Sequence, residues 1–139
     1  MKFSAHLAVS AMLAALFYPV FGINSFLILI GGIFADIVLF LHFVFIKKRF
    51  NPFECNRYYT EEHKSTNYGK FDGILMIFHT MEFLILMLVL SFYSKLAFIF
   101  TIGIVGHYIL DAIWFIYFVK RIVLNHSIIL WLAKKFQKL

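Results

Sequence analysis

The chain has few of the residues that soluble proteins place on their surfaces. Only 14% of its 139 residues are charged and 63% are hydrophobic, whereas a soluble domain has about 25% charged and about 45–50% apolar residues. Its one cysteine, Cys55, excludes an intramolecular disulfide and a zinc site built from several cysteines. No repeat and no Pro- or Gly-rich linker is present. We therefore expect a single membrane domain over residues 1–139.

Four apolar segments are long enough to cross a membrane. A membrane-spanning helix needs about 20 largely apolar residues to cross about 30 Å of hydrocarbon. Such segments are found at residues 3–21, 26–46, 73–93 and 96–119. The connections at residues 22–25 and 94–95 are so short that each consecutive pair is expected to form an antiparallel hairpin. The sequence thus predicts an all-α fold, an integral membrane bundle of four transmembrane helices.

The basic residues are distributed unequally between the two ends of this bundle. All but one of the 13 Lys and Arg residues lie before the first segment, in loop 47–72 or after residue 119, and the exception is Lys95. Because Lys and Arg concentrate in cytoplasmic segments, we expect both termini and loop 47–72 in the cytoplasm. The net charge of +6 is therefore interpreted as a match to membrane lipids and not to nucleic acid. A homo-oligomer stays open.

Two polar segments lie outside the predicted spans. Loop 47–72 contains the helix breaker Asn51-Pro52 and is either a lid over the bundle or a solvated linker. The tail 122–139 has apolar residues at helical spacing, which favours a short helix lying on the anionic inner leaflet. Those residues are Ile129, Leu132, Ala133 and Phe136, with Lys134, Gln137 and Lys138 opposite them. The alternative is a simple continuation of the fourth helix.

The apolar segments contain ionisable side chains but no Lys or Arg to pair with them. A charge at the centre of a bilayer costs about 2.5–3.5 kcal/mol, so such residues are functional candidates. The three acids must be protonated, face water or bind a cation. The residues concerned are Asp36, Glu82, Asp111, His6, His42, His79 and His107.

Sequence spacing favours a cation. His79 and Glu82 are three residues apart and His107 and Asp111 are four apart, so each pair is expected on one face of its helix. Counted at about 1.5 Å per residue, six residues lie in the cytoplasmic half of the bundle. We predict that these six bind metal: His6, Asp36, His79, Glu82, His107 and Asp111. Imidazole with carboxylate indicates a divalent transition metal, zinc first and manganese or iron as alternatives.

The other histidines fit this site less well. His42 is six residues after Asp36, on a different face and close to the membrane interface. His63 and His126 fall in the loop and the tail, where we expect them to be solvated. For His6, a hydrogen bond to a neighbouring carbonyl stays open beside the ligand role.

The motifs that carry these residues resemble a known family. The first segment has His6, the second has Gly-Gly-x-x-x-Asp ending at Asp36, the third has His-Thr-x-Glu from His79 to Glu82, and the fourth has Gly-His-x-x-x-Asp ending at Asp111. This order resembles the YdjM-like, LexA-regulated, membrane-bound metal-dependent hydrolases, a family grouped with zinc-dependent phospholipase C. Where that family has Pro-Asp-x-Asp-His in the second helix, this chain has Ala-Asp-Ile-Val-Leu.

The resemblance implies metal-dependent hydrolysis of a phosphoric ester, such as a lipid head group reached from the inner leaflet. It implies one or two zinc ions, with Asp36 and Glu82 as the catalytic carboxylates. Two other classes stay open from the residues alone. One is a haem or quinone anchor with His79 and His107 as axial ligands, which leaves the acids unexplained. The other is a small ion or proton translocator, in which buried acids and histidines are common.

Overall fold

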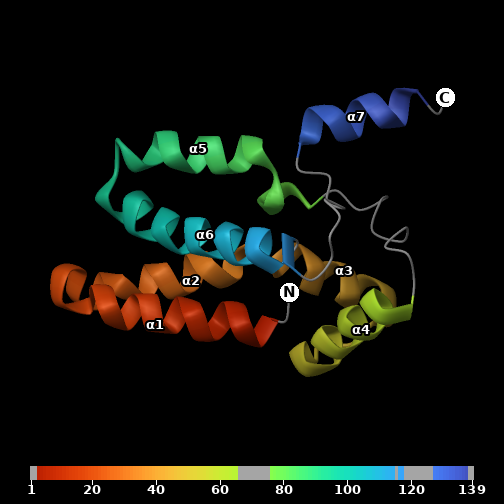
Figure 1. The fold of residues 1–139 in the computed structure, drawn as a ribbon, viewed down its shortest axis with the longest axis horizontal. Helices are drawn as coiled ribbons and strands as arrows, with labels where there is room; N and C mark the ends of the chain where they lie inside the picture. Colours follow the sequence, from red (N-terminus) through yellow and green to blue (C-terminus); the bar gives the residue numbers. More distant parts are fainter. Residues whose placement is uncertain (1–2, 66–75, 115, 118–126, 138–139) are drawn as a thin grey trace.

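The computed structural model describes residues 3–65, 76–114, 116–117 and 127–137, and its regular elements are all helical (Figure 1). They are α1 (Phe3–Phe21), the 3-10 turn η1 (Gly22–Ser25), α2 (Phe26–Phe34), α3 (Ile37–Lys47), α4 (Pro52–Ser65), the 3-10 turn η3 (Ile77–His79), α5 (Met81–Ser91), α6 (Lys95–Trp114) and α7 (Ile128–Phe136). The all-α prediction is confirmed for these ranges. Parts of the predicted third and fourth spans, of the loop and of the tail lie outside the described residues.

Both predicted hairpins are present. Helix α1 packs on α2 and α5 packs on α6, while α6 also contacts α1 and α2. The two turns, at η1 and at Ser94, lie at one end of the bundle, and α1 begins at the other end (Figure 1). Gly22 has φ +56°, a left-handed conformation that glycine adopts without steric cost. The sequence Gly-Ile-Asn-Ser therefore reverses the chain within four residues.

Helices α2 and α6 approach each other so closely that no side chain fits between them at two positions. A Cβ atom on Gly31 would lie 2.2 Å from the carbonyl oxygen of Phe100, and one on Gly103 would lie 2.1 Å from that of Ile28. Small residues permit this kind of backbone contact between membrane helices. The contact fixes α6 against α2, and with it the polar residues further along α6.

The bundle exposes large apolar side chains on its outside and buries several polar side chains in its interior, beside apolar ones such as Ile28 and Ile99. On α1, Met12, Leu16 and Val20 are 71%, 70% and 68% exposed, whereas His6 and Ser10 are buried. A soluble protein has the reverse arrangement, because large apolar patches are unfavourable in water. The outside of this bundle is therefore suited to hydrocarbon.

Two helical segments among the described residues are long and apolar enough to cross a membrane. They are Phe3–Phe34, which turns back at η1, and Lys95–Trp114. Helices α3 and α5 are apolar but have 11 residues each, or about 16 Å at 1.5 Å per residue. That is about half of the hydrocarbon thickness. The four-span arrangement and its orientation stay predictions.

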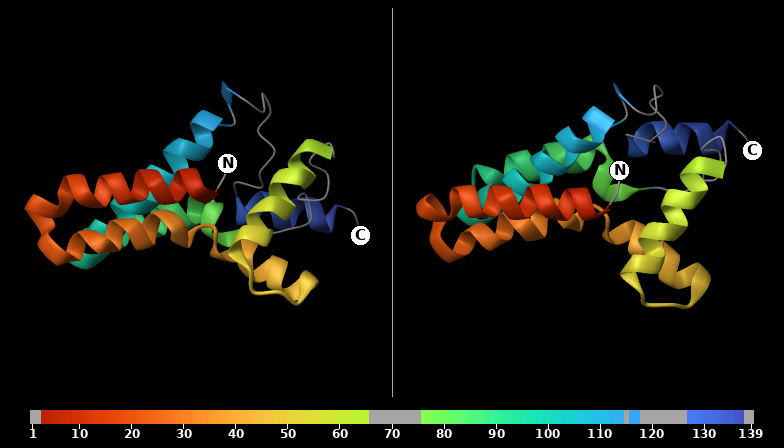
Figure 2. Two further views of the ribbon diagram at one scale, coloured as in Figure 1. Left: turned by 90° about the horizontal axis from the view of Figure 1, so that it is seen from below. Right: turned by 60° about the horizontal axis from the view of Figure 1, so that its bottom comes forward.

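The second predicted span consists of two helices and not one. Helix α2 ends at Phe34, Ala35 and Asp36 form a turn, and α3 begins at Ile37. At the turn the N–H of Asp36 donates to the carbonyl of Ile33 at 3.2 Å, the tighter 3-10 pattern that commonly ends a helix. Figure 2 shows that α3 and α4 leave the bundle as a separate hairpin.

The predicted loop 47–72 contains the helix α4. Its breaker sequence begins this helix, because the side-chain oxygen of Asn51 accepts from the N–H groups of Phe53 and Glu54 and Pro52 takes the first helical position. On α4, Cys55 and Tyr59 are buried in a cluster with Phe43 of α3 and Met76. Burial raises the pKa of the Cys55 thiol to about 11, and burial likewise raises the pKa of Tyr59.

Single hydrogen bonds attach α4 to the rest of the molecule. The hydroxyl of Tyr59 donates to the carbonyl of Leu39 at 3.2 Å and lies 2.7 Å from Nδ1 of His42. The side-chain oxygen of Asn56 accepts from the N–H of Phe3 at 3.3 Å. These contacts hold α4 beside both α3 and the start of α1.

The described part of the third predicted span begins as an irregular segment. After η3, Thr80 is extended with φ −90° and ψ 150°. Its Oγ1 accepts from the N–H of Phe83 at 3.3 Å and so caps α5. His79 and Glu82 consequently lie in different elements. The expectation that they share one helical face is wrong, because Thr80 interrupts the helical geometry between them.

The predicted tail helix is confirmed as α7. Ser127 caps it, since its Oγ accepts from the N–H of Leu130 at 3.3 Å. Ile129, Leu132 and Phe136 are exposed, as expected for a helix that offers an apolar face to a surface. Residues 122–126 and 138–139 of the tail lie outside the described ranges.

Candidate metal centre

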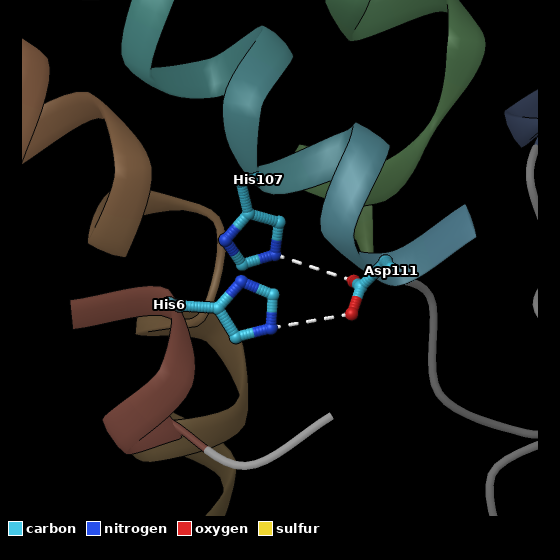
Figure 3. Close-up of side chains that lie close together, drawn as sticks. All are labelled: His6, His107 and Asp111. Atoms are coloured by element: carbon cyan, nitrogen blue, oxygen red, sulfur yellow. Dashed lines mark ion pairs between the residues drawn. The ribbon is translucent and has the colours of Figure 1, made fainter. Parts of the chain in front are cut away.

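The polar residues of the interior meet at the end of the bundle where α1 begins. His6 projects from the first turns of α1, Asp36 lies in the break between α2 and α3, and His79 ends η3. His107 and Asp111 lie one turn apart on α6, and Figure 3 shows them facing His6. The three histidines are buried, at 1%, 6% and 1% exposure in chain order. Five of the six predicted ligands thus come together from four parts of the chain.

The ring of His107 is oriented by a backbone carbonyl. Its Nδ1 lies 2.7 Å from the carbonyl oxygen of Gly32. A carbonyl only accepts hydrogen bonds, so Nδ1 carries the proton and Nε2 of the neutral ring keeps its lone pair. Gly32 lies on α2 between two close contacts: a Cβ on it would meet Ser10 of α1, and a Cβ on Gly103 of α6 would lie 2.7 Å from its backbone nitrogen. The tight packing of the helices therefore directs Nε2 of His107 into the site.

Two imidazoles and two carboxylates converge on one point. Nε2 of His107 lies 3.1 Å from Nε2 of His79 and 3.3 Å from Oδ2 of Asp111. Nε2 of His79 lies 3.5 Å from the same Oδ2. Oδ1 of Asp36 is 3.9 Å from each of the two Nε2 atoms. These are the two strongest metal-ligand types for a site without cysteine.

The separations among His79, His107 and Asp111 are close to those of ligands on one small metal ion, and Asp36 lies somewhat farther away. Bonds of about 2.0–2.1 Å from zinc to nitrogen or oxygen require ligand atoms about 3.3 Å apart. The five separations between the imidazole and carboxylate atoms run from 3.1 to 3.9 Å. Two overlapping groups could hold an ion, namely His6 with His107 and Asp111, and Asp36 with His79 and His107.

His6 supports the site from the side of α1. Its Nε2 lies 3.2 Å from Oδ1 of Asp111, and its ring stacks on that of His107 with centroids 3.9 Å apart. His6 thereby holds one oxygen of Asp111 while the other oxygen faces the two imidazoles. Carboxylate ligands of metals are usually hydrogen-bonded by such an outer partner. This placement favours an outer role for His6.

Tyr108 positions His79. Its hydroxyl lies 3.0 Å from the carbonyl oxygen of Phe78 and 2.8 Å from that of Thr80, the residues on either side of His79. The sequence analysis did not identify the carbonyl of Gly32 as a partner of the site. Backbone acceptors give no signal in a sequence, since every residue carries one.

Glu82 is directed to another part of the molecule. Its Oε1 accepts from the hydroxyl of Ser127 at 2.5 Å, and Ser127 is the residue that caps α7. The structure thus joins Glu82 to the tail helix and not to the five residues that converge. His42 pairs with Tyr59, and the side chains of His63 and His126 lie outside the described residues.

We found no match to this chain among protein-family models, curated proteins or solved structures. The resemblance to the YdjM-like hydrolases therefore stays a prediction from the motifs, and the function is argued from the site.

Proposed function

We propose that this chain is a multi-pass membrane protein that binds a divalent transition metal, zinc first, and uses it to hydrolyse a phosphoric ester. The observation that carries the proposal is the convergence of His79, His107 and Asp111 at 3.1 to 3.5 Å, with Asp36 at 3.9 Å from both imidazoles. A cation there would also compensate two carboxylates that no Lys or Arg of the apolar segments can pair with.

The membrane part of the proposal rests on the apolar outside of the bundle and on the distribution of charge. The site lies at the end of the bundle where α1 begins, opposite the turn that contains Lys95. All other Lys and Arg residues fall in segments that the positive-inside rule assigns to the cytoplasm. We accordingly place the site in the cytoplasmic half of four spans.

A divalent ion held at this point would supply a Lewis acid for a phosphoryl oxygen and would lower the pKa of bound water to about 7. The residues of the chain then have distinct tasks. His107 and Asp111 are held in place by Gly32 and His6. Asp36 lies farthest from the imidazoles, at 3.9 Å, and also borders a cavity. His79, His107 and Asp111 would hold the ion as three protein ligands and leave its fourth position open. Asp36 is therefore the carboxylate that can exchange a proton with a bound substrate, while Glu82 positions α7.

The geometry argues against axial haem ligation. A haem iron would need a flat opening for the porphyrin between the rings of His79 and His107. Their Nε2 atoms are 3.1 Å apart, and the carboxylates of Asp36 and Asp111 lie within 3.9 Å of them. That space is filled by groups that ligate small cations.

Metal analysis of the protein purified in detergent tests the proposal. We expect about one transition-metal ion per chain in the wild type, loss of most of it in His107→Ala, and full retention in the matched control His42→Ala. The loaded protein should release phosphate from phosphatidic acid in mixed micelles, and His107→Ala should not. Equal metal content in the two histidine variants, or a haem absorption band without bound metal, would refute the proposed centre.

A further inference from the structure

A cavity of about 470 Å³ lies between the break of the second segment and α4. Its volume falls in the range of small-molecule sites, about 300–1,000 Å³. Its walls are mostly apolar, with Ile33 from α2, Phe40 from α3, and Pro52 and Cys55 from α4 among them. The cavity exists because α3 leaves the bundle at Asp36 and α4 returns beside it.

The polar groups of the cavity wall are mostly engaged with the protein itself. The hydroxyl of Tyr59 contacts Leu39 and His42, and the side-chain oxygen of Asn56 accepts from Phe3. The thiol of Cys55 is buried within an apolar cluster. The carboxylate of Asp36 is the acidic group of the wall, and its Oδ1 lies 3.9 Å from the two converging imidazoles.

Part of the cavity wall reaches the apolar outside of the molecule. Ile30 and Ile37 line the cavity and are themselves 48% and 39% exposed. A molecule entering past these residues comes from an apolar surface and not from water. The cavity therefore adjoins both the apolar surface, at Ile30 and Ile37, and the candidate metal centre, at Asp36.

We propose that this cavity binds the hydrocarbon chain of a membrane lipid whose phosphoryl group lies next to Asp36. The inference rests on the proposed function and names its substrate class, a lipid phosphoester and not a water-soluble one. The chain would exchange the hydrocarbon of the bilayer for an equally apolar wall, and it would bring the phosphoryl group to the converging imidazoles. A soluble ester would gain nothing from the cavity.

Photo-crosslinking in nanodiscs tests the chain site without relying on catalysis. The probe is a phosphatidic acid with a diazirine in its acyl chain, used in the presence of chelator. We expect adducts on cavity residues of α2, α3 and α4. Ile33→Trp, which fills the cavity, should reduce them about tenfold, or about 1.4 kcal/mol. Ile30→Trp should do the same, and it tolerates the larger ring because it is half-exposed.

The matched control is Leu16→Trp on the exposed face of α1, which should leave the cavity adducts unchanged. Adducts that fall equally on the outer face of α1 and on the cavity, with no effect of either cavity variant, would overturn the inference. Cavity-specific adducts in a protein that binds no metal would uphold the chain site while the hydrolase proposal fails. If the rate of hydrolysis changed neither with the length of the acyl chain nor with Ile33→Trp, the chain site would be overturned while the hydrolase proposal would stand.

Discussion

The bundle core and its periphery are built by different means. In the core, α2 and α6 touch through their backbones, and glycine is required at the points of contact. At the periphery, α4 is attached through side chains, namely the cluster of Cys55 and Tyr59 with Phe43 and hydrogen bonds such as that of Tyr59 to Leu39, and Ser127 at the start of α7 bonds to Glu82. The position of the His107 imidazole depends on the close packing of α2 and α6. The shape of the cavity depends on how the side chains hold α4 beside α3.

The largest effect is expected from Gly103→Ala in the core. The added Cβ would lie 2.1 Å from the carbonyl oxygen of Ile28 and 2.7 Å from the N of Gly32. Backbone cannot move aside as a side chain can, so the loss should reach the upper end of the 1–3 kcal/mol typical of overpacking, about 3 kcal/mol. The measurement is thermal unfolding in detergent.

Gly106→Ala on the same helix is the matched control. There the Cβ would meet only the flexible end of Leu13 at 3.0 Å, and alanine favours the helix by about 1 kcal/mol. We expect its thermal midpoint to stay within a few degrees of the wild type. Equal destabilisation by both substitutions would show that close α2–α6 contact is not what stabilises the core.

Metal removal should give the next largest effect. An ion that binds only the folded protein stabilises it by about 2.7 kcal/mol at a free concentration of 100 Kd. Chelation should therefore lower the thermal midpoint, and added metal should restore it. Asp36→Asn should blunt this response. The control is Glu54→Gln on α4, which removes a carboxylate that pairs with Arg49 and should leave the response to chelation unchanged. A translocator predicts no response to chelation and loss of ion flux in Asp36→Asn.

A smaller effect is expected at the contact between Glu82 and Ser127. Loss of a capping hydroxyl costs about 1 kcal/mol, so Ser127→Ala should speed amide hydrogen exchange in α7. Ser94→Ala, which removes an acceptor for the N–H of Ala97, should not affect α7. The protein with Glu82→Gln should bind as much metal as the wild type. If Glu82→Gln lost its bound metal while hydrogen exchange in α7 stayed unchanged, Glu82 would be a metal ligand, as its motif predicts.

The smallest effect concerns Cys55 at the wall of the cavity. Its pKa of about 11 in the folded protein is above the ordinary 9.0, so the folded state holds the thiol proton more tightly than the unfolded state. The contribution of the protonated Cys55 thiol to the free energy of unfolding is complete below pH 9 and is lost as the pH rises towards 11. Alkylation should therefore be slow at pH 8 and speed up above pH 10 or on unfolding. Fast reaction at pH 8 would show that α4 opens readily.

Local spacing predicted part of the candidate site correctly. His107 and Asp111 share a face because α6 is a regular helix through both residues. The spacing of His79 and Glu82 misled, because Thr80 is extended and caps a new helix. Spacing gives the direction of side chains only where the backbone is regular. The break at Asp36 was missed as well, since the apolar pattern runs through it without a proline or glycine at that point.

The sequence by itself determined the helical class, the two hairpins, the apolar outside and the set of histidines and acids available to a metal. These follow from composition and from contacts between near neighbours in the chain. Only the tertiary structure decided that Asp36 faces His79 and His107, that Gly32 sets the proton position on His107, and that Glu82 turns to Ser127. Each of these contacts joins residues from different helices, and their positions depend on how closely the helices pack.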